Sequence, residues 1–198
     1  MNKYENLSDL TLIQLSLEDH RNFEVLMERY EPLLLRYIKR IANVSREEAE
    51  DLLQEIFIKV YRNLNGFDQK LKFSSWIYRI AHNEIVNHVY KQKVRSVVTS
   101  MDDNNEHHLK QGKWTEESEA YFDLESKESS KRLRDALMEL PEKYREVLIL
   151  KFFEDKSYRE ISDILKKPEG TVATLINRAK KKFKKVAKRY QLESEIQP

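Results

Sequence analysis

The 198-residue chain contains no cysteine and only three glycines and four prolines. The lack of cysteine excludes disulfides and thiolate metal sites, and it fits a reducing compartment. The scarcity of glycine and proline leaves few turn residues for a β-sandwich or barrel, so a fold of long helices is favoured. No apolar run approaches the roughly 18 residues that span a membrane, and residues 1–10 are too polar for a signal peptide. We therefore predict a soluble cytoplasmic protein without membrane insertion.

Charge is distributed unevenly along the chain, although the formal net charge is only +2. Acidic residues predominate between Met101 and Glu128. The stretch from Arg178 to Arg189 is instead rich in lysine and arginine and contains no acid. A basic end of this kind indicates binding to a polyanion.

Apolar residues recur at helical spacing in three segments of the first half of the chain. The first segment runs from Asp19 to Ile41, where Pro32 predicts a kink or a break. A short helix opened by Ser8 or Asp9 is expected before it, because both residue types favour the N-cap position.

The second and third segments have clearer boundaries. Ser45 and Glu48 form a capping box at the start of the second helix. The Asn-Gly pair at 65–66 should end it, because glycine tolerates the left-handed conformation of a helix C-cap. The third helix is expected to begin after Ser74 and to end near Lys93.

The helical pattern is lost between Arg95 and Glu128, an acidic segment that we interpret as a linker, mobile in the unbound protein. About thirty residues without structure are unusual inside one compact domain, so the segment indicates two domains. Helices resume near Ser129, and Pro141 suits the first position of the next helix. We predict an all-α fold of two small helical domains, residues 1–94 and 129–198, joined by a flexible acidic linker at 95–128.

Residues 157–182 carry the strongest functional pattern. A second capping box, Ser157 with Glu160, opens a short helix, and a turn containing Gly170 separates it from a last helix that starts at Thr171. This order is typical of a helix-turn-helix, in which small polar residues approach base edges and lysines neutralise phosphates. A solvated lysine-rich helix is the alternative interpretation. The candidate DNA-contacting residues are Thr171, Ala173, Thr174, Asn177, Arg178, Lys181 and Lys182.

The third helix offers a second candidate surface. Basic and aromatic residues are interleaved off its apolar stripe, which suits DNA because aromatic rings can stack on unpaired bases. An ordinary polar helix face is the alternative, and Trp76 is expected in the core. The face comprises Tyr78, Arg79, His82, Asn83, Asn87, His88, Tyr90 and Lys91.

The second helix presents Asp51, Gln54 and Glu55 outside its apolar stripe. No pocket or metal-ligand cluster accompanies the two acids, so docking of another protein is favoured over acid–base chemistry. His107 and His108 lie on the predicted linker without a third ligand nearby in the sequence. The chain also lacks a glycine-rich phosphate loop and a nucleophile motif. We predict no metal site, no cofactor and no enzymatic activity.

Two blocks of this sequence resemble the extracytoplasmic-function (ECF) sigma factors of RNA polymerase, a group within the sigma-70 family. The segments from Ala49 to Asp68 (AEDLLQEIFIKVYRNLNGFD) and from Phe73 to Lys93 (FSSWIYRIAHNEIVNHVYKQK) resemble region 2. The segment from Leu140 to Lys185 (LPEKYREVLILKFFEDKSYREISDILKKPEGTVATLINRAKKKFKK) resembles region 4. Both blocks occur in the order and at the separation of the family, which is more specific than either block alone.

The resemblance implies a protein that binds core RNA polymerase and directs initiation at promoter DNA by reading −10 and −35 elements. It implies that the second helix docks on polymerase through Asp51, Gln54 and Glu55. It implies −35 contacts from Thr171, Thr174, Asn177, Arg178, Lys181 and Lys182. It implies −10 contacts from the loop before the third helix and from that helix itself, through Lys72, Tyr78, Arg79, His82, Asn83, Asn87 and Lys91. An anti-sigma factor is a further partner that the resemblance implies.

The chain departs from the family at the recognition helix, where members commonly carry a basic residue at the position of Leu175 and often another at Ala173. Weaker or differently specified −35 contacts are therefore expected. The main alternative is a stand-alone helix-turn-helix transcriptional regulator, which explains residues 129–190 but leaves the first domain unexplained. A helical protein-interaction module and a small enzyme are further alternatives. Binding of core polymerase distinguishes a sigma factor from a stand-alone regulator. Salt-dependent DNA binding distinguishes it from a protein-interaction module.

Overall fold

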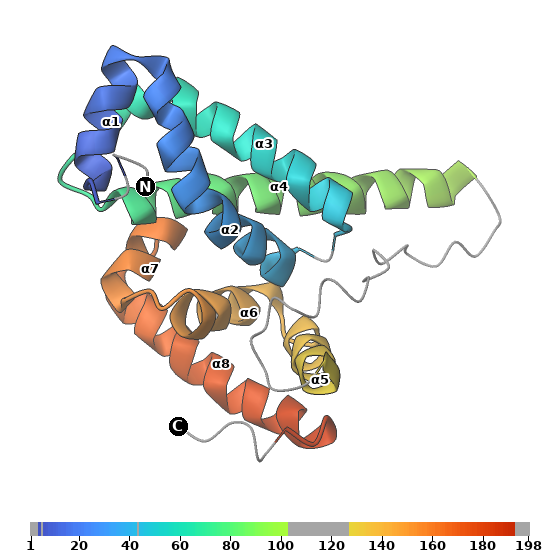
Figure 1. The fold of residues 1–198 in the computed structure, drawn as a ribbon. Coiled ribbons are helices and arrows are strands. Elements are labelled where there is room, and N and C mark those ends of the chain that lie inside the picture. The colour runs from blue at the N-terminus through green and yellow to red at the C-terminus, as the bar shows by residue number, and fades with distance from the viewer. Residues whose placement is uncertain (1–3, 5, 43, 103–126, 193–198) are drawn as a thin grey trace.

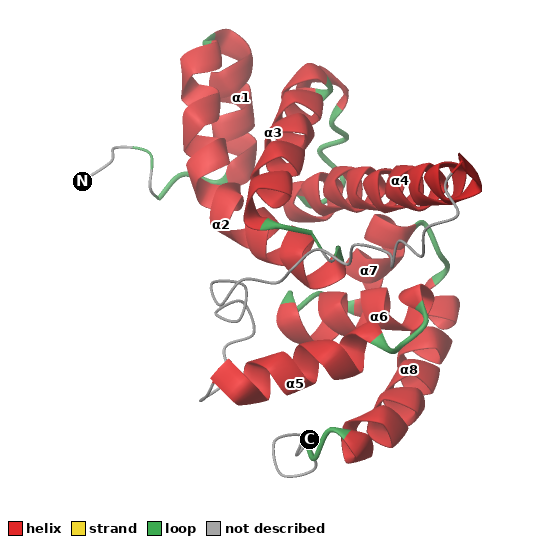
Figure 2. Cartoon of the chain, turned by 90° about the vertical axis from the view of Figure 1, so that its right-hand side faces the viewer, coloured by secondary structure: helices red, strands yellow, loops and turns green. Residues whose placement is uncertain are grey.

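The computed structural model describes residues 4, 6–42, 44–102 and 127–192, and it is helical with no strand among them (Figures 1 and 2). The all-α prediction is confirmed for this part of the chain. The helices of the first bundle are α1 (Asp9–Glu18), η1 (His20–Asn22), α2 (Phe23–Ile41), α3 (Arg46–Arg62), η2 (Leu64–Gly66) and α4 (Phe73–Asp102). Those of the second are α5 (Lys127–Met138), α6 (Glu142–Leu148), the π-helical turn η4 (Ile149–Phe153), α7 (Tyr158–Leu165) and α8 (Glu169–Arg189).

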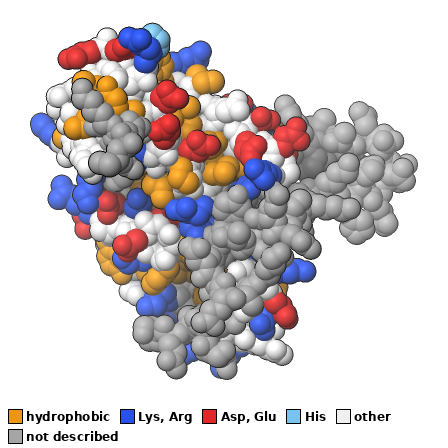
Figure 3. All heavy atoms as spheres, in the orientation of Figure 1, with side chains coloured by type: hydrophobic (Ala, Val, Ile, Leu, Met, Phe, Trp, Pro, Cys, Tyr) orange, Lys and Arg blue, Asp and Glu red, His pale blue; other side chains and the backbone are white. Residues whose placement is uncertain are grey.

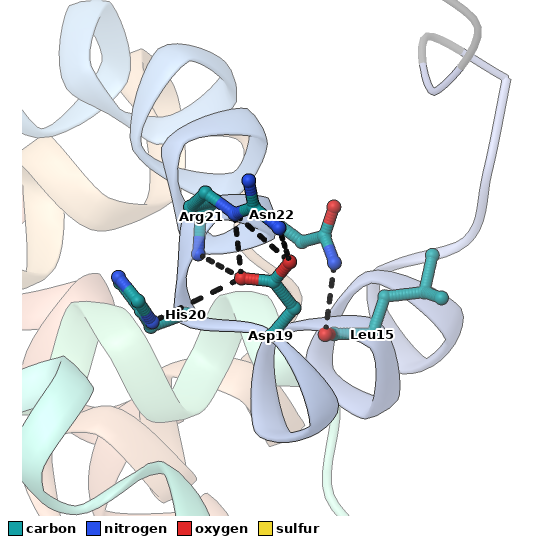
Figure 4. A network of polar contacts seen from close by, with 5 residues as sticks. All are labelled: Leu15, Asp19, His20, Arg21 and Asn22. Atoms are coloured by element: carbon teal, nitrogen blue, oxygen red, sulfur yellow. Dashed lines mark hydrogen bonds and ion pairs between the residues drawn. The ribbon is translucent and has the colours of Figure 1, made fainter.

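The caps that the sequence predicted lie at the starts of α1 and α3. The Ser8 hydroxyl accepts a hydrogen bond from the backbone N–H of Thr11, and Ser45 and Glu48 form the reciprocal capping box. At the corner between α1 and α2, the Asp19 carboxylate accepts hydrogen bonds from the backbone and the guanidinium of Arg21 (Figure 4). These hydrogen bonds lower the pKa of Asp19 to about 2. The chain reversal is thus fixed by local hydrogen bonds.

An aromatic cluster joins the loop at 67–72 to the start of α4. Phe67 lies between Phe73 and Trp76, with ring centroids 5.4 and 5.3 Å away, and Tyr30 of α2 packs edge-on against Phe73. Trp76 is buried, as predicted. Aromatic pairs at these distances stabilise packing beyond the area that they bury. The cluster therefore anchors the loop on the bundle.

Two sequence-based expectations about the first bundle were wrong, those about Gly66 and about the end of α4. At Pro32, where a kink or a break was predicted, helix α2 continues without a break. Gly66 does not adopt a left-handed conformation; it ends a 3₁₀ turn that follows α3. Helix α4 runs to Asp102, past the predicted end near Lys93, because no glycine or proline interrupts the chain there. Residues 103–126 of the predicted linker lie outside the described residues.

The second bundle contains the predicted helix-turn-helix, formed by α7 and α8. The capping box of Ser157 and Glu160 is present at the start of α7. The turn is made by Lys166, whose φ of 52° is left-handed, and not by Gly170, which lies in the first turn of α8. Helix α8 accordingly starts two residues earlier than predicted. Buried Val172, Ile176 and Ala179 fix its apolar face on the bundle.

The two bundles pack directly against each other. Helix α7 lies against α4, and η4 lies against α2, so the second bundle sits beneath the first in Figure 1. Their buried side chains form one cluster that runs through both bundles. The described residues therefore adopt a closed arrangement, which local sequence patterns do not predict.

Candidate nucleic-acid and protein interfaces

Helix α8 presents an exposed polar and basic face away from its apolar stripe. Its exposed residues include six of the seven candidates for DNA contact, all except Ala173: Thr171, Thr174, Asn177, Arg178, Lys181 and Lys182. The Thr174 hydroxyl donates a hydrogen bond to the Gly170 carbonyl at 2.9 Å, and the Lys182 ammonium lies 5.6 Å from the Tyr144 ring centroid. All six side chains are nevertheless exposed, so this face of α8 is open to a polyanion.

Two α8 positions at which a basic residue was expected from the resemblance carry small or apolar side chains, Ala173 and Leu175. Ala173 and Leu175 are half-buried, and the Leu175 side chain packs against the core. An apolar side chain at 175 therefore contributes to packing of the recognition helix.

The candidate face of α4 is divided into an open part and a covered part. Asn83, Asn87 and Lys91 are exposed, and Arg79 is half-buried. Tyr78 is only 1% exposed and His82 is 9% exposed, so the prediction that both lie on an exposed face of α4 was wrong for this arrangement. The second bundle covers both side chains: Glu154 contacts Tyr78, and Glu146 Oε1 lies 3.9 Å from His82 Nε2.

The contacts of the covered residues are specific. The Tyr78 hydroxyl donates a hydrogen bond to Glu154 Oε2 at 2.7 Å, and the Lys156 ammonium lies 4.1 Å from the Tyr78 ring centroid. His82 Nδ1 lies 3.1 Å from the Tyr37 hydroxyl, and burial lowers the pKa of His82 to about 4. At neutral pH, His82 is therefore an uncharged buried residue in this arrangement.

The loop before α4 is also in contact with the second bundle. Lys72 is exposed, and its Nζ lies 3.1 Å from Glu160 Oε1 at the start of α7. The Glu160 carboxylate is held by the Ser157 capping box as well, and these hydrogen bonds lower its pKa to about 2. The lysine predicted to meet DNA is therefore paired with an acid of the helix-turn-helix.

A hollow of about 340 Å³ lies between the end of α3 and the exposed part of α4. Trp76 and Ile80 give it an apolar wall, and Asn83 supplies an amide. The other lining residues include Lys59, Asn63 and Glu84, with Lys59 and Glu84 forming an ion pair. Of these, sequence reasoning selected only Asn83. The hollow was missed because it depends on how the end of α3 approaches α4.

Helix α3 presents an acidic face opposite its buried stripe. Asp51, Gln54 and Glu55 are all exposed, and Ile58 on the same side is 50% exposed. Acidic and hydrophobic side chains are interspersed over the first bundle in the view of Figure 3. A mixed acidic and apolar surface suits a protein partner that carries complementary positive charge.

Neither metal binding nor membrane insertion receives support within the described part of the chain. No group of three or more potential ligands there could hold a metal ion. None of the helices in those ranges is long and apolar enough to cross a membrane. His107 and His108 lie outside the described residues.

Comparisons with known families agree with the two-bundle architecture. Residues 26–95 match sigma-70 region 2, and residues 130–183 match sigma-70 region 4. The chain therefore belongs to the sigma-70 family of RNA polymerase sigma factors. More particularly, its relatives include ECF sigma factors, so the predicted family is confirmed. It is a factor that directs promoter-specific transcription initiation with core RNA polymerase, and a stand-alone regulator is not favoured.

Individual relatives cover most of this chain. It is 31% identical to the ECF RNA polymerase sigma-E factor of Haemophilus influenzae over 98% of both chains. It is 35% identical to the RNA polymerase sigma-H factor of Pseudomonas aeruginosa over 84% of this chain and 86% of that one. The ECF sigma factor SigW of Bacillus subtilis is also 35% identical, over 70% of this chain and 74% of its own.

Two solved structures share the fold. The sigma factor RpoE from Bartonella quintana, solved with the anti-sigma factor NepR, has a TM-score of 0.64 at 21% identity and covers 85% of this chain and 98% of its own. CnrH, solved with the cytosolic domain of CnrY, has a TM-score of 0.65 at 19% identity and covers 91% and 97%. Both likenesses support the helical architecture described above.

Proposed function

We propose that three separate surfaces of this sigma factor bind three different partners. Helix α3 docks on core polymerase through Asp51, Gln54 and Glu55. Helix α8 reads the −35 element as duplex, and α4 with the preceding loop captures the melted −10 strand. The observation that carries the proposal is the presence of an exposed acidic helix face and an exposed basic helix-turn-helix on opposite bundles of one chain. Each surface suits a different partner.

The −35 role rests on the open face of α8. Thr171, Thr174 and Asn177 lie in the N-terminal half of the helix, where a recognition helix approaches base edges in the major groove. Arg178, Lys181 and Lys182 follow on the exposed side and would neutralise phosphates. This division predicts that the lysines contribute affinity and that the polar residues contribute sequence preference.

The −10 role rests on the open part of α4 and on the hollow beside it. A volume of about 340 Å³ falls within the range of small-molecule sites, and an apolar wall with one amide can hold a base that has left the duplex. Asn83 would hydrogen-bond that base. Asn87 and Lys91, further along α4, would contact the neighbouring nucleotides of the same strand. Lys72, Tyr78, Arg79 and His82 complete the proposed surface.

The proposed domain division follows the same surfaces. Residues 1–94 would form the polymerase-docking and −10 domain, 95–128 the linker, and 129–198 the −35 domain. The protein would act in the cytoplasm as a non-catalytic factor without a cofactor. An anti-sigma factor is a further proposed partner, because RpoE of Bartonella quintana was solved with one.

The docking role can be tested by replacing Asp51 and Glu55 together with alanine. Loss of two exposed acids should weaken binding to core polymerase by about 10-fold or more, because charged groups at an interface set both association rate and affinity. The matched control is Glu24→Ala with Glu28→Ala, two exposed acids at the same spacing on α2. Binding should be measured by fluorescence titration of labelled protein with core enzyme. Equal affinities of wild type and the Asp51/Glu55 variant would refute the docking role.

A further inference from the structure

The polar part of the hollow between α3 and α4 is built from side chains of both helices. Helix α3 supplies Lys59 and α4 supplies Glu84, and the two side chains form an ion pair that joins the helices. Asn63, directly after α3, also lines the hollow, and its Nδ2 donates a hydrogen bond to the Lys59 carbonyl oxygen at 2.7 Å. The remaining polar atom of that amide, Oδ1, is an acceptor. The hollow thus combines a carboxylate and an amide oxygen with one ammonium group.

The two members of the ion pair differ in their exposure to water. The Lys59 side chain is 48% exposed, so its ammonium group can stay hydrated, whereas the Glu84 side chain is only 12% exposed. A carboxylate has about four lone-pair positions, and Lys59 Nζ bonds to only one of the two oxygens, Oε2. Glu84 therefore keeps acceptor capacity for a ligand in the hollow, although most of its side chain is shielded from solvent.

The four bases differ in what they offer to such an acceptor. Adenine, cytosine and guanine carry an exocyclic amino group, and glutamate accepts hydrogen bonds from the cytosine amino group in DNA recognition. Thymine instead carries a carbonyl oxygen on each side of its N3–H. A carboxylate that approaches this edge meets another acceptor with no proton between them. That contact is unfavourable for a shielded carboxylate, because both oxygens lose water without gaining a hydrogen bond.

We propose that Glu84 selects the base held in this hollow, so that a base with an exocyclic amino group is accepted and thymine is rejected. The inference rests on the proposed −10 role of α4, in which Asn83 binds the same base. Trp76 and Ile80 form an apolar wall that suits the face of any base, so they do not discriminate. Lys59 is a positioning residue, which holds the carboxylate and offsets its charge beside the phosphates of the strand.

Single-stranded DNA binding by the holoenzyme, this chain together with core polymerase, tests the selection. Random-sequence 12-mers are enriched on the holoenzyme, and an abasic site is then placed at each position of the most enriched strand in turn. The position held in the hollow is the one at which the loss of affinity caused by the abasic site becomes smaller in Asn83→Ala. We expect adenine, cytosine or guanine at this position of the enriched strands, and not thymine.

Cytosine and uracil are then compared at this position, because their rings have the same size and cytosine has an amino group where uracil has a carbonyl oxygen. In anisotropy competition assays, the wild-type holoenzyme should bind the cytosine strand about 10-fold or more tightly than the uracil strand. Glu84→Gln, a variant of similar size, should reduce this ratio to about 2-fold or less, because an amide can also donate to the uracil oxygen. Lys59→Gln should weaken the binding of both strands and keep the preference for cytosine.

The matched control is Glu139→Gln. Glu139 is also an acid in an ion pair, with Arg189, but it lies in the second bundle, so its replacement should leave the ratio unchanged. Equal binding of the two strands by wild type, or an unaltered ratio in Glu84→Gln, would overturn the selection by Glu84 and leave the −10 role intact. An abasic scan in which Asn83→Ala alters no position would overturn the −10 role of the hollow, and the selection with it.

Discussion

A lysine on α8 can contact a DNA phosphate only if its side chain is exposed on the DNA-facing side of the helix. Lys181 is exposed on the proposed DNA face. Each phosphate contact releases roughly 0.9 counterion from duplex DNA, so Lys181→Ala should lower the salt slope of binding by about one. Lys131→Ala on α5, also exposed, should leave the slope unchanged. The slope is obtained from anisotropy titrations over a series of salt concentrations, and an unaltered slope in Lys181→Ala would remove this residue from the interface.

Glu146 is the buried acid whose titration should be visible in the stability of the protein. Burial on α6 is the main cause that raises its pKa to about 7 from a usual 4.5. The folded protein therefore holds a proton that the unfolded chain has released, and stability should fall as pH rises from about 4.5 through 7. Glu146→Gln should remove this fall and be more stable than wild type by about 2 kcal/mol at pH 8.

Urea denaturation of wild type and Glu146→Gln at several pH values provides the measurement. His82 acts in the opposite direction, because its lowered pKa costs stability as pH falls from about 6.5 through 4. Because His82 Nε2 lies only 3.9 Å from Glu146 Oε1, both proteins should carry His82→Gln, so that the difference between their stabilities isolates Glu146. A difference that is independent of pH would contradict the assignment.

At the scale of the element, α7 depends on its two ends. The Ser157 hydroxyl accepts the backbone N–H of Glu160, and Lys166 closes the helix in a left-handed conformation. Ser157→Ala should destabilise the protein by about 1 kcal/mol through loss of the cap. Lys166→Gly should stabilise it by up to about 1 kcal/mol, because glycine adopts a positive φ without a steric penalty. Thermal unfolding of both variants checks the pair, and shifts of equal sign would contradict the cap geometry.

Element starts could be predicted from the sequence better than element ends. Ser8, Ser45 and Ser157 identified three helix starts, because an N-cap uses side-chain chemistry that is visible in a few neighbouring residues. The left-handed residue at the end of α7 is a lysine, so the glycine rule pointed to the wrong position. Pro32 lies inside a continuous α2, where packing of the flanking turns outweighs the lost hydrogen bond.

At the scale of the whole molecule, the free protein should bind promoter duplex poorly. In the closed arrangement Tyr78 and His82 of α4 are buried and Lys72 is paired with Glu160, so these three residues cannot add to the affinity of the α8 face. Binding of a promoter fragment should be about 100-fold or more tighter with core polymerase present, as measured by gel shift. Tight, sequence-specific binding by the free chain would contradict this.

The contact between the bundles lay beyond sequence reasoning. Glu154 accepts hydrogen bonds from Arg40 and Tyr78, yet it is far from both in the chain and resembles an ordinary surface charge in the sequence. Tyr78 and His82 lie outside the apolar stripe of α4, and for that reason they were predicted to face DNA. Helical periodicity identifies the face that a helix buries within its own bundle, but it carries no information about a second bundle that covers the opposite face.

The most direct test of the account is run-off transcription with purified protein and bacterial core polymerase on a pooled genomic promoter library. We expect discrete start sites that need both components and that share one −10 and one −35 sequence. The start sites should be lost when Asp51 and Glu55 are both replaced with alanine. Specific duplex binding without core binding and without initiation would contradict the account, because it would leave only a helix-turn-helix regulator.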